Sequence, residues 1–182
     1  MNQSHNRPIQ KLEVARSQLL TAIQLWFADG DPISIHTLAG AAYQILHDIH
    51  MQRGGSPLLF DSVFVKGDRR AQWNHAVKEH MNFFKHADRD PNGTIAFDPS
   101  LTEPFLSLSL FILEGLGAQL TPEEAAFQFW CVLHNPDWLD DRGQDRFINR
   151  FNADELTEYR HTPRQGFCSM YKLRIHKVIT KK

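Results

Sequence analysis

The chain has 182 residues, of which 42% are hydrophobic and 23% are charged, with thirteen Phe and four Trp. This length and this supply of large apolar side chains fit one domain with a substantial core, and they exclude disorder over most of the chain. The net charge is only -1, but residues 160–182 contain seven Lys and Arg and no acidic residue, so residues 1–159 carry about -8. The sequence therefore predicts a helical domain over 1–159 and a basic C-terminal tail over 160–182.

Three features favour a cytoplasmic location. The N-terminal residues lack the apolar core of a signal peptide, and the most apolar segment, 104–120, contains Glu114 and is short for a bilayer span. Cys131 and Cys168 are too few and too far apart for a disulfide framework or a zinc finger. We therefore expect a cytoplasmic protein that has no membrane partner.

The first two predicted helices occupy residues 9–27 and 32–53, where apolar residues recur at three- and four-residue steps. Asp31 is placed to cap the second helix, with Pro32 in its first turn. Gly40 and the two alanines after it would allow a neighbouring helix to approach closely.

A third helix is predicted over residues 68–88, with Asp68 as its N-cap, and it ends before the turn signal Asp90-Pro91-Asn92-Gly93. On either side of this helix, residues 58–65 and 94–97 have the composition of short extended segments. Each of these two segments is therefore a candidate for a short strand.

Residues 101–116 are apolar nearly all round, so we expect them to form the most buried helix, with Phe111 in the core. The next helix begins at a capping box, Thr121-Pro122-Glu123-Glu124. A further helix is predicted over residues 142–159.

The tail has a different pattern. Tyr171, Leu173 and Ile175 alternate with basic or polar residues, which is the period of a strand but leaves a short helix open. The fold class predicted for the whole chain is mainly α, a single-domain bundle of five or six helices with two short strands and the basic tail.

The helix predicted over 68–88 concentrates titratable side chains on one face. At 100° per residue, four of them fall within about 60° of one another, and the apolar side chains gather on the opposite side. The polar set is His75, Glu79, Asn82 and His86, and the apolar set is Trp73, Val77, Met81 and Phe84. We therefore favour a binding or interaction module, with ligand-binding residues Glu79, Asn82, Lys85 and His86. The alternative is an ordinary solvated face, because any surface helix carries a polar stripe opposite its apolar one.

A transition-metal site is a further hypothesis. His36 and His47 lie on one stripe of the second predicted helix, and antiparallel packing would bring His36 level with His86 and His47 level with His75. Imidazole and carboxylate ligands suit divalent Zn, Ni, Fe or Mn. The candidate metal ligands are His36, His47, His75, Glu79 and His86.

Arg70 and His75 are separated by four residues. This Arg-x4-His spacing resembles the short Arg/His motif of HEPN-type helical domains, although it lies earlier in the chain than the family motif usually does. The resemblance covers about seven residues. It implies an often dimeric helical bundle that binds or cleaves RNA, with His75 as catalytic acid or base and Arg70 as the group that stabilises phosphate charge. On a regular helix the two side chains would point about 140° apart, so they converge only if Arg70 lies in a loop or cap.

The basic tail raises a separate question of partners. Its excess of Lys and Arg could contact RNA or an acidic partner protein, and a homodimer is also open. The alternative is that the tail offsets the acidic body, within the same chain or in a dimer.

Overall fold

The computed structural model describes residues 7–58, 60–61, 65–88, 90–138 and 140–179. Over these ranges the chain is mainly helical, with eight α-helices, three short 3-10 helices and no strand. The α-helices are α1 (Lys11–Phe27), α2 (Pro32–Gln52), α3 (Arg70–Phe83), α4 (Thr102–Gly115), α5 (Pro122–His134), α6 (Asp141–Phe147), α7 (Ala153–His161) and α8 (Arg164–Ile179). The predicted fold class is therefore confirmed as mainly α, but with more helices than expected.

The two short strands that the sequence predicts do not form among the residues described. Residues 94–97 have no regular secondary structure, and of the segment 58–65 the described residues are likewise irregular, while 59 and 62–64 lie outside the described residues. The turn signal between them is confirmed, because the amide of Gly93 donates to the carbonyl of Asp90 at 2.8 Å.

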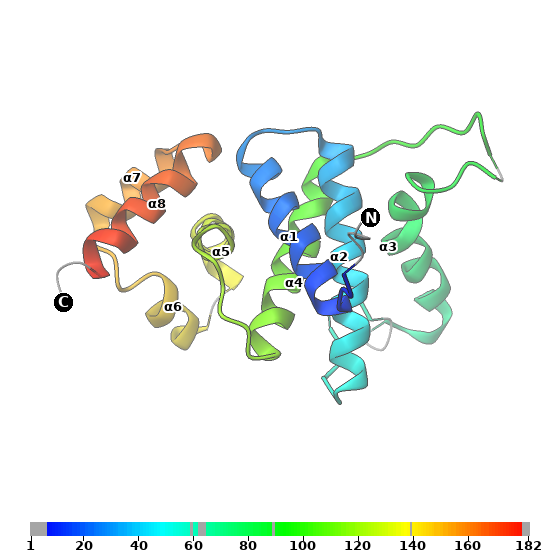
Figure 1. Ribbon diagram of the computed structural model, residues 1–182, viewed down its shortest axis with the longest axis horizontal. Coiled ribbons are helices and arrows are strands. Elements are labelled where there is room, and N and C mark those ends of the chain that lie inside the picture. The colour runs from blue at the N-terminus through cyan, green and yellow to red at the C-terminus, as the bar shows by residue number, and fades with distance from the viewer. Residues whose placement is uncertain (1–6, 59, 62–64, 89, 139, 180–182) are drawn as a thin grey trace, which may run out of the picture.

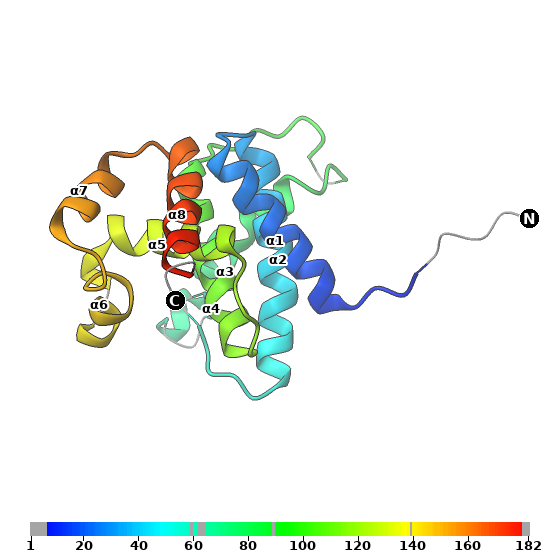
Figure 2. The ribbon, with the colours of Figure 1, turned by 60° about the vertical axis from the view of Figure 1, so that its left-hand side comes forward.

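Helices α1, α2, α4 and α5 form the centre of the bundle, with α1 against α2 and α5, and α4 against α2 and α5. Helix α3 packs on the outer side of α2, and α6, α7 and α8 lie on the side of α5, as Figures 1 and 2 show. The segment that joins α3 to α4 extends past the end of α3 (Figure 1).

Helix starts follow the local signals closely. The side chain of Asp31 accepts from the amide of Ser34 at 2.7 Å, which caps α2 as predicted. The capping box of α5 is also present, since Thr121 and Glu124 each accept from the backbone amide of the other. Helix α3 differs, because a 3-10 turn over Gly67–Arg69 precedes it and Asp68 is not its N-cap.

Helix α4 is buried on one side only. Leu106, Leu110 and Leu113 are fully buried, but Phe111 is 58% exposed. The expectation that Phe111 belongs to the core was therefore wrong, because α4 contacts α1, α2 and α5 and its remaining side faces solvent. Although α4 holds the most apolar segment, no helix in the described ranges is long and apolar enough to cross a membrane.

The single helix predicted over 142–159 is two helices, α6 and α7. Asn152 ends the connection between them, because its side chain accepts from the amide of Glu155 at 2.9 Å and the Glu155 carboxylate accepts from the amide of Asn152 at 2.9 Å. This second capping box starts α7 and leaves Phe151 buried in the connection before it.

The basic tail forms helix α8, which packs on α5 and α1. Phe167 and Tyr171, one turn apart, are buried and fix its orientation, whereas Leu173 is exposed. Its charges face acids of the body: Arg164 pairs with Asp29, Lys172 with Glu123, and Arg174 with Glu155 at 3.0 Å. These contacts match the interpretation that the tail offsets the acidic body within the same chain.

Candidate functional site

The apolar face of α3 holds this helix on the bundle, as its periodicity predicts. Met81 is buried and lies against Gly40 of α2, so closely that a Cβ at position 40 would come within 2.8 Å of the Met81 side chain. The small residue at 40 thus permits the approach that the sequence suggested. His80 also lies on this side, and its Nε2 is 2.9 Å from the carbonyl oxygen of Ala96.

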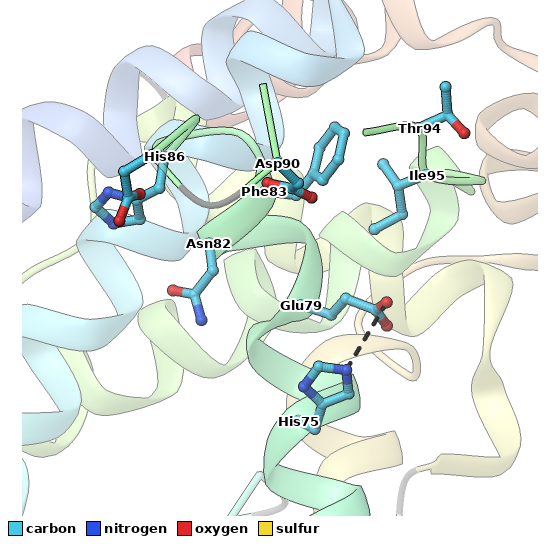
Figure 3. A pocket seen from close by; sticks show the side chains of 9 residues that line it. His75, Glu79, Asn82, Phe83, His86, Asp90, Thr94 and Ile95 are labelled. Carbon is cyan, nitrogen blue, oxygen red and sulfur yellow. Dashed lines mark ion pairs between the residues drawn. The ribbon is translucent and has the colours of Figure 1, made fainter. Parts of the chain in front are cut away.

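With its apolar face against α2, α3 turns its polar face toward Asp88 and residues 90–95. Together they form a surface hollow of about 680 Å³, which we call the α3 hollow (Figure 3). Its lining residues are His75, Glu79, Asn82, Phe83, His86, Asp88, Asp90, Thr94 and Ile95. The four residues of the predicted polar stripe are therefore all in this lining.

One detail of the stripe differs from the prediction. Helix α3 ends at Phe83 rather than near residue 88, so His86 lies beyond the helix. The amide of His86 still donates to the carbonyl of Asn82 at 3.1 Å, which continues the helical turn for one more bond. His86 consequently reaches the hollow from the turn after α3 and not from the helix itself.

The charges in the α3 hollow are unevenly distributed. Glu79, Asp88 and Asp90 contribute three carboxylates, and no Lys or Arg is among the described residues that line it. Glu79 lies between His75 and Ile95 in Figure 3, with its Oε1 3.9 Å from Nε2 of His75. The side chains of His75 and Glu79 are 76% and 45% exposed, so a ligand can reach both from solvent.

The hollow also has apolar and hydrogen-bonding surfaces. Phe83 and Ile95 are half-buried and present their side chains to it, while Asn82 and Thr94 are exposed and can each donate and accept. This combination of carboxylates, an apolar strip and neutral polar groups can hold a positively charged group that has a hydrocarbon stem.

Two residues predicted for the site lie elsewhere. Lys85 is exposed and is not in the lining of the α3 hollow. Arg70 is the first residue of α3, its Nε donates to the carbonyl of Val65 at 3.0 Å, and it too is outside the lining. The hollow therefore contains His75 without Arg70, and the HEPN-like ribonuclease stays a prediction from the sequence.

The structure does not bring the five predicted metal ligands together. His36 is buried and its ring lies 6.0 Å from that of His80, so it faces His80 and not His86. His47 is held by Asp61, with its Nε2 2.8 Å from Oδ1, away from His75. In the described part of the chain, no group of three or more His, Cys, Asp or Glu residues could hold a metal ion.

His36 has a structural setting of its own. Its Nδ1 and the hydroxyl of Thr102 form a hydrogen bond of 2.9 Å, and rings of Phe84, Phe97 and Phe105 surround it at 5.1 to 5.7 Å. Burial lowers the pKa of His36 to about 4, and the nearby charges of His80 and Lys85 act in the same direction. His36 thus joins α2 to α4 and to the end of α3 as a neutral side chain.

Sequence reasoning missed the far wall of the hollow, which is built by Asp88, Asp90, Thr94 and Ile95. A signal was present, because Asp88 lies just before the turn Asp90-Pro91-Asn92-Gly93 and Asp90 is its first residue. A turn at this point can fold the chain back over the polar face of α3, but a turn signal does not specify the direction in which the following residues run. Comparisons of the chain with protein-family models, with characterised proteins and with solved structures give no match.

Proposed function

We propose that this protein is an interaction module whose α3 hollow binds a basic segment of a partner protein, with a Lys or Arg side chain in the hollow. The observation that carries the proposal is the gathering of Glu79, Asp88 and Asp90 in one surface hollow whose described lining has no Lys or Arg. Each carboxylate attracts an incoming cation, and no described Lys or Arg of the lining competes with that cation.

The shape of the hollow supports a side chain rather than a bare ion. Lys and Arg carry a charged head on a hydrocarbon stem, and such stems pack along apolar surface while the head stays near polar groups. Phe83 and Ile95 offer that surface beside the carboxylates. The volume of the α3 hollow, about 680 Å³, is larger than one side chain, so neighbouring residues of the partner segment also fit.

The exposure of the site determines how strong this binding is. Exposed ion pairs contribute about 0.2–1 kcal/mol each and are screened by salt. Glu79 is 45% exposed, so we expect a weak, rapidly formed and salt-sensitive complex rather than a permanent one. Asn82 and Thr94 can add hydrogen bonds to the backbone of the bound segment.

The proposal predicts a specific loss of affinity on removing two of the carboxylates. The probe is a short fluorescein-labelled peptide of alternating lysine and serine, compared with its counterpart that has glutamine in place of lysine. Fluorescence anisotropy should show binding of the lysine peptide only. The double change Glu79→Gln with Asp88→Asn should weaken this binding about tenfold, because two exposed pairs together account for about 1.4 kcal/mol.

The matched control removes the same charge from another surface. Asp154 and Glu158 are exposed acids of α7, so Asp154→Asn with Glu158→Gln changes the net charge equally without touching the hollow. General attraction between an acidic body and a cationic peptide would weaken equally in both double variants. Equal losses in the two variants, or equal binding of the lysine and glutamine peptides, would refute the proposal.

A further inference from the structure

A second pocket shares no lining residue with the α3 hollow and is independent of the function proposed for that hollow. It has a volume of about 450 Å³ and is formed by the turn between α1 and α2, the beginning of α4 and the first residue of α8. Figures 1 and 2 both show the beginning of α8 beside that turn. We call it the Glu103 pocket, after the acid at the start of α4.

Three charged residues line this pocket, and two of them neutralise each other. Arg164 forms an ion pair with Asp29, and Nε2 of Gln165 also donates to the Asp29 carboxylate at 2.6 Å. The Arg164 guanidinium lies over the ring of Trp26, 4.7 Å from its centroid. Arg164 is therefore held by both an acid and an aromatic ring, and an anionic ligand would have to displace Asp29 to reach it.

The third charged residue, Glu103, has a different environment. It is half-buried, and the Trp26 indole, which lines the same pocket, acts on its carboxylate as a neutral polar group. No described residue forms an ion pair with it, although Arg164 and His134 are near enough to act on it electrostatically. Burial raises the pKa of Glu103, because removal of the carboxylate from water disfavours its charged form more than Arg164, His134 and Trp26 together favour it.

The rest of the lining is suited to a small hydrocarbon group. Pro32, Ile35 and Pro99 supply apolar walls, and Ser100 is a neutral polar residue of the lining. Small-molecule sites typically combine such walls with a few placed polar groups, within a volume of about 300–1,000 Å³. Asp29 and Arg164 are paired with each other, so Glu103 is the charged residue of the described lining that has no ion-pair partner. A ligand that complements this pocket is therefore a cation.

From this arrangement we propose that the Glu103 pocket binds a small organic amine, whose ammonium group pairs with the Glu103 carboxylate while its hydrocarbon part lies against Pro32, Ile35 and Pro99. The bound ammonium group gives Glu103 an ion-pair partner, which no described residue of the chain provides. The internal Arg164–Asp29 pair stays in place and closes the pocket to anions.

The test uses n-butylamine as the probe, with n-butanol as the neutral analogue of the same length. The NMR resonance of the Trp26 indole N–H is the reporter, because Trp26 lines the same pocket as Glu103. At pH 7.5, butylamine should shift it in a saturable way with a dissociation constant on the order of 1 mM, as expected for so small a ligand. Butanol should not produce a saturable shift, and binding of the amine should lower the pKa of Glu103, followed by its side-chain carboxyl resonance.

Glu103→Gln is the decisive variant, because glutamine keeps the size of the side chain and an acceptor oxygen but removes the charge. It should weaken butylamine binding at least tenfold, while Glu158→Gln on the exposed face of α7 should leave it unchanged. Circular dichroism verifies that both variants are folded. A shift that does not saturate up to about 50 mM, equal binding of amine and alcohol, or undiminished affinity in Glu103→Gln would overturn the proposal.

Discussion

Replacing Phe129 by alanine should lower the free energy of unfolding by about 3–5 kcal/mol, the usual cost of removing a buried aromatic ring. Phe129 is fully buried in α5. Its ring stacks on Phe151 at 4.4 Å, and it contacts Tyr159, Phe167 and Tyr171 at 5.1 to 5.8 Å. One side chain thus joins α5 to α7, to α8 and to the connection before α7, so its loss leaves a cavity that none of them alone can fill.

Chemical denaturation measured by circular dichroism provides the test, with Phe111→Ala as the matched control. Phe111 is the same residue type on the neighbouring helix but is 58% exposed. Its truncation should change stability by no more than about 0.5 kcal/mol, as surface substitutions generally do. A loss of less than about 1 kcal/mol for Phe129→Ala, or equal losses for both variants, would contradict this arrangement of the core.

The second large effect is a dependence of stability on pH that originates at His36. Its pKa is about 4 in the folded protein, against 6.5 for an unperturbed histidine, because the ring is buried among Phe84, Phe97 and Phe105. In addition, its Nε2 has no hydrogen-bond partner among the described residues, so a proton there would lack an acceptor. The unfolded chain therefore binds a proton more readily than the folded chain between these two pH values.

The direction of the effect follows from that difference. The stabilisation is fully present above pH 6.5 and is lost as the pH falls from 6.5 toward 4, because protonation then favours the unfolded state. The shift corresponds to about 3 kcal/mol at most. His80 and Lys85, which face His36 from the α3 side, make protonation of His36 still less favourable.

His36→Phe isolates this contribution. Phenylalanine fits the aromatic surroundings but cannot titrate, and it leaves the Thr102 hydroxyl without its 2.9 Å partner. The variant should therefore be about 1 kcal/mol less stable at pH 7, yet its stability should fall less steeply between pH 6.5 and 4. Urea unfolding at a series of pH values measures both, and parallel curves for the two proteins would show that His36 is not the source.

Local sequence signals predicted this structure best where short-range chemistry decides the outcome. The caps at Asp31 and Thr121 depend on hydrogen bonds that span three residues, and both form. The two faces of α3 depend on helical periodicity alone, which placed Met81 in the core and the polar stripe away from it. Asn152 and Glu155 carried an equally local signal for the start of α7, and it was overlooked.

Where packing between helices decides the outcome, the sequence was insufficient. A helix that is apolar on all sides, such as α4, does not specify which side faces solvent, so the exposure of Phe111 could not be derived. The rotation of α2 relative to α3 places His36 opposite His80 instead of His86, and no single-helix pattern contains that rotation. The Glu103 pocket combines segments more than 100 residues apart, Asp29 and Arg164 among them, and has no local signature.

Mapping the bound lysine–serine peptide on the ¹⁵N-labelled protein by two-dimensional NMR tests the proposed function most directly. The account predicts that the largest shifts occur at the backbone amides of Glu79, Asn82, Asp90 and Thr94, which line the α3 hollow from both sides. It also predicts that these shifts saturate and that they diminish as salt is added. Shifts concentrated at another acidic surface such as α7, or spread evenly over the acidic body, would contradict the assignment of the hollow as the binding site.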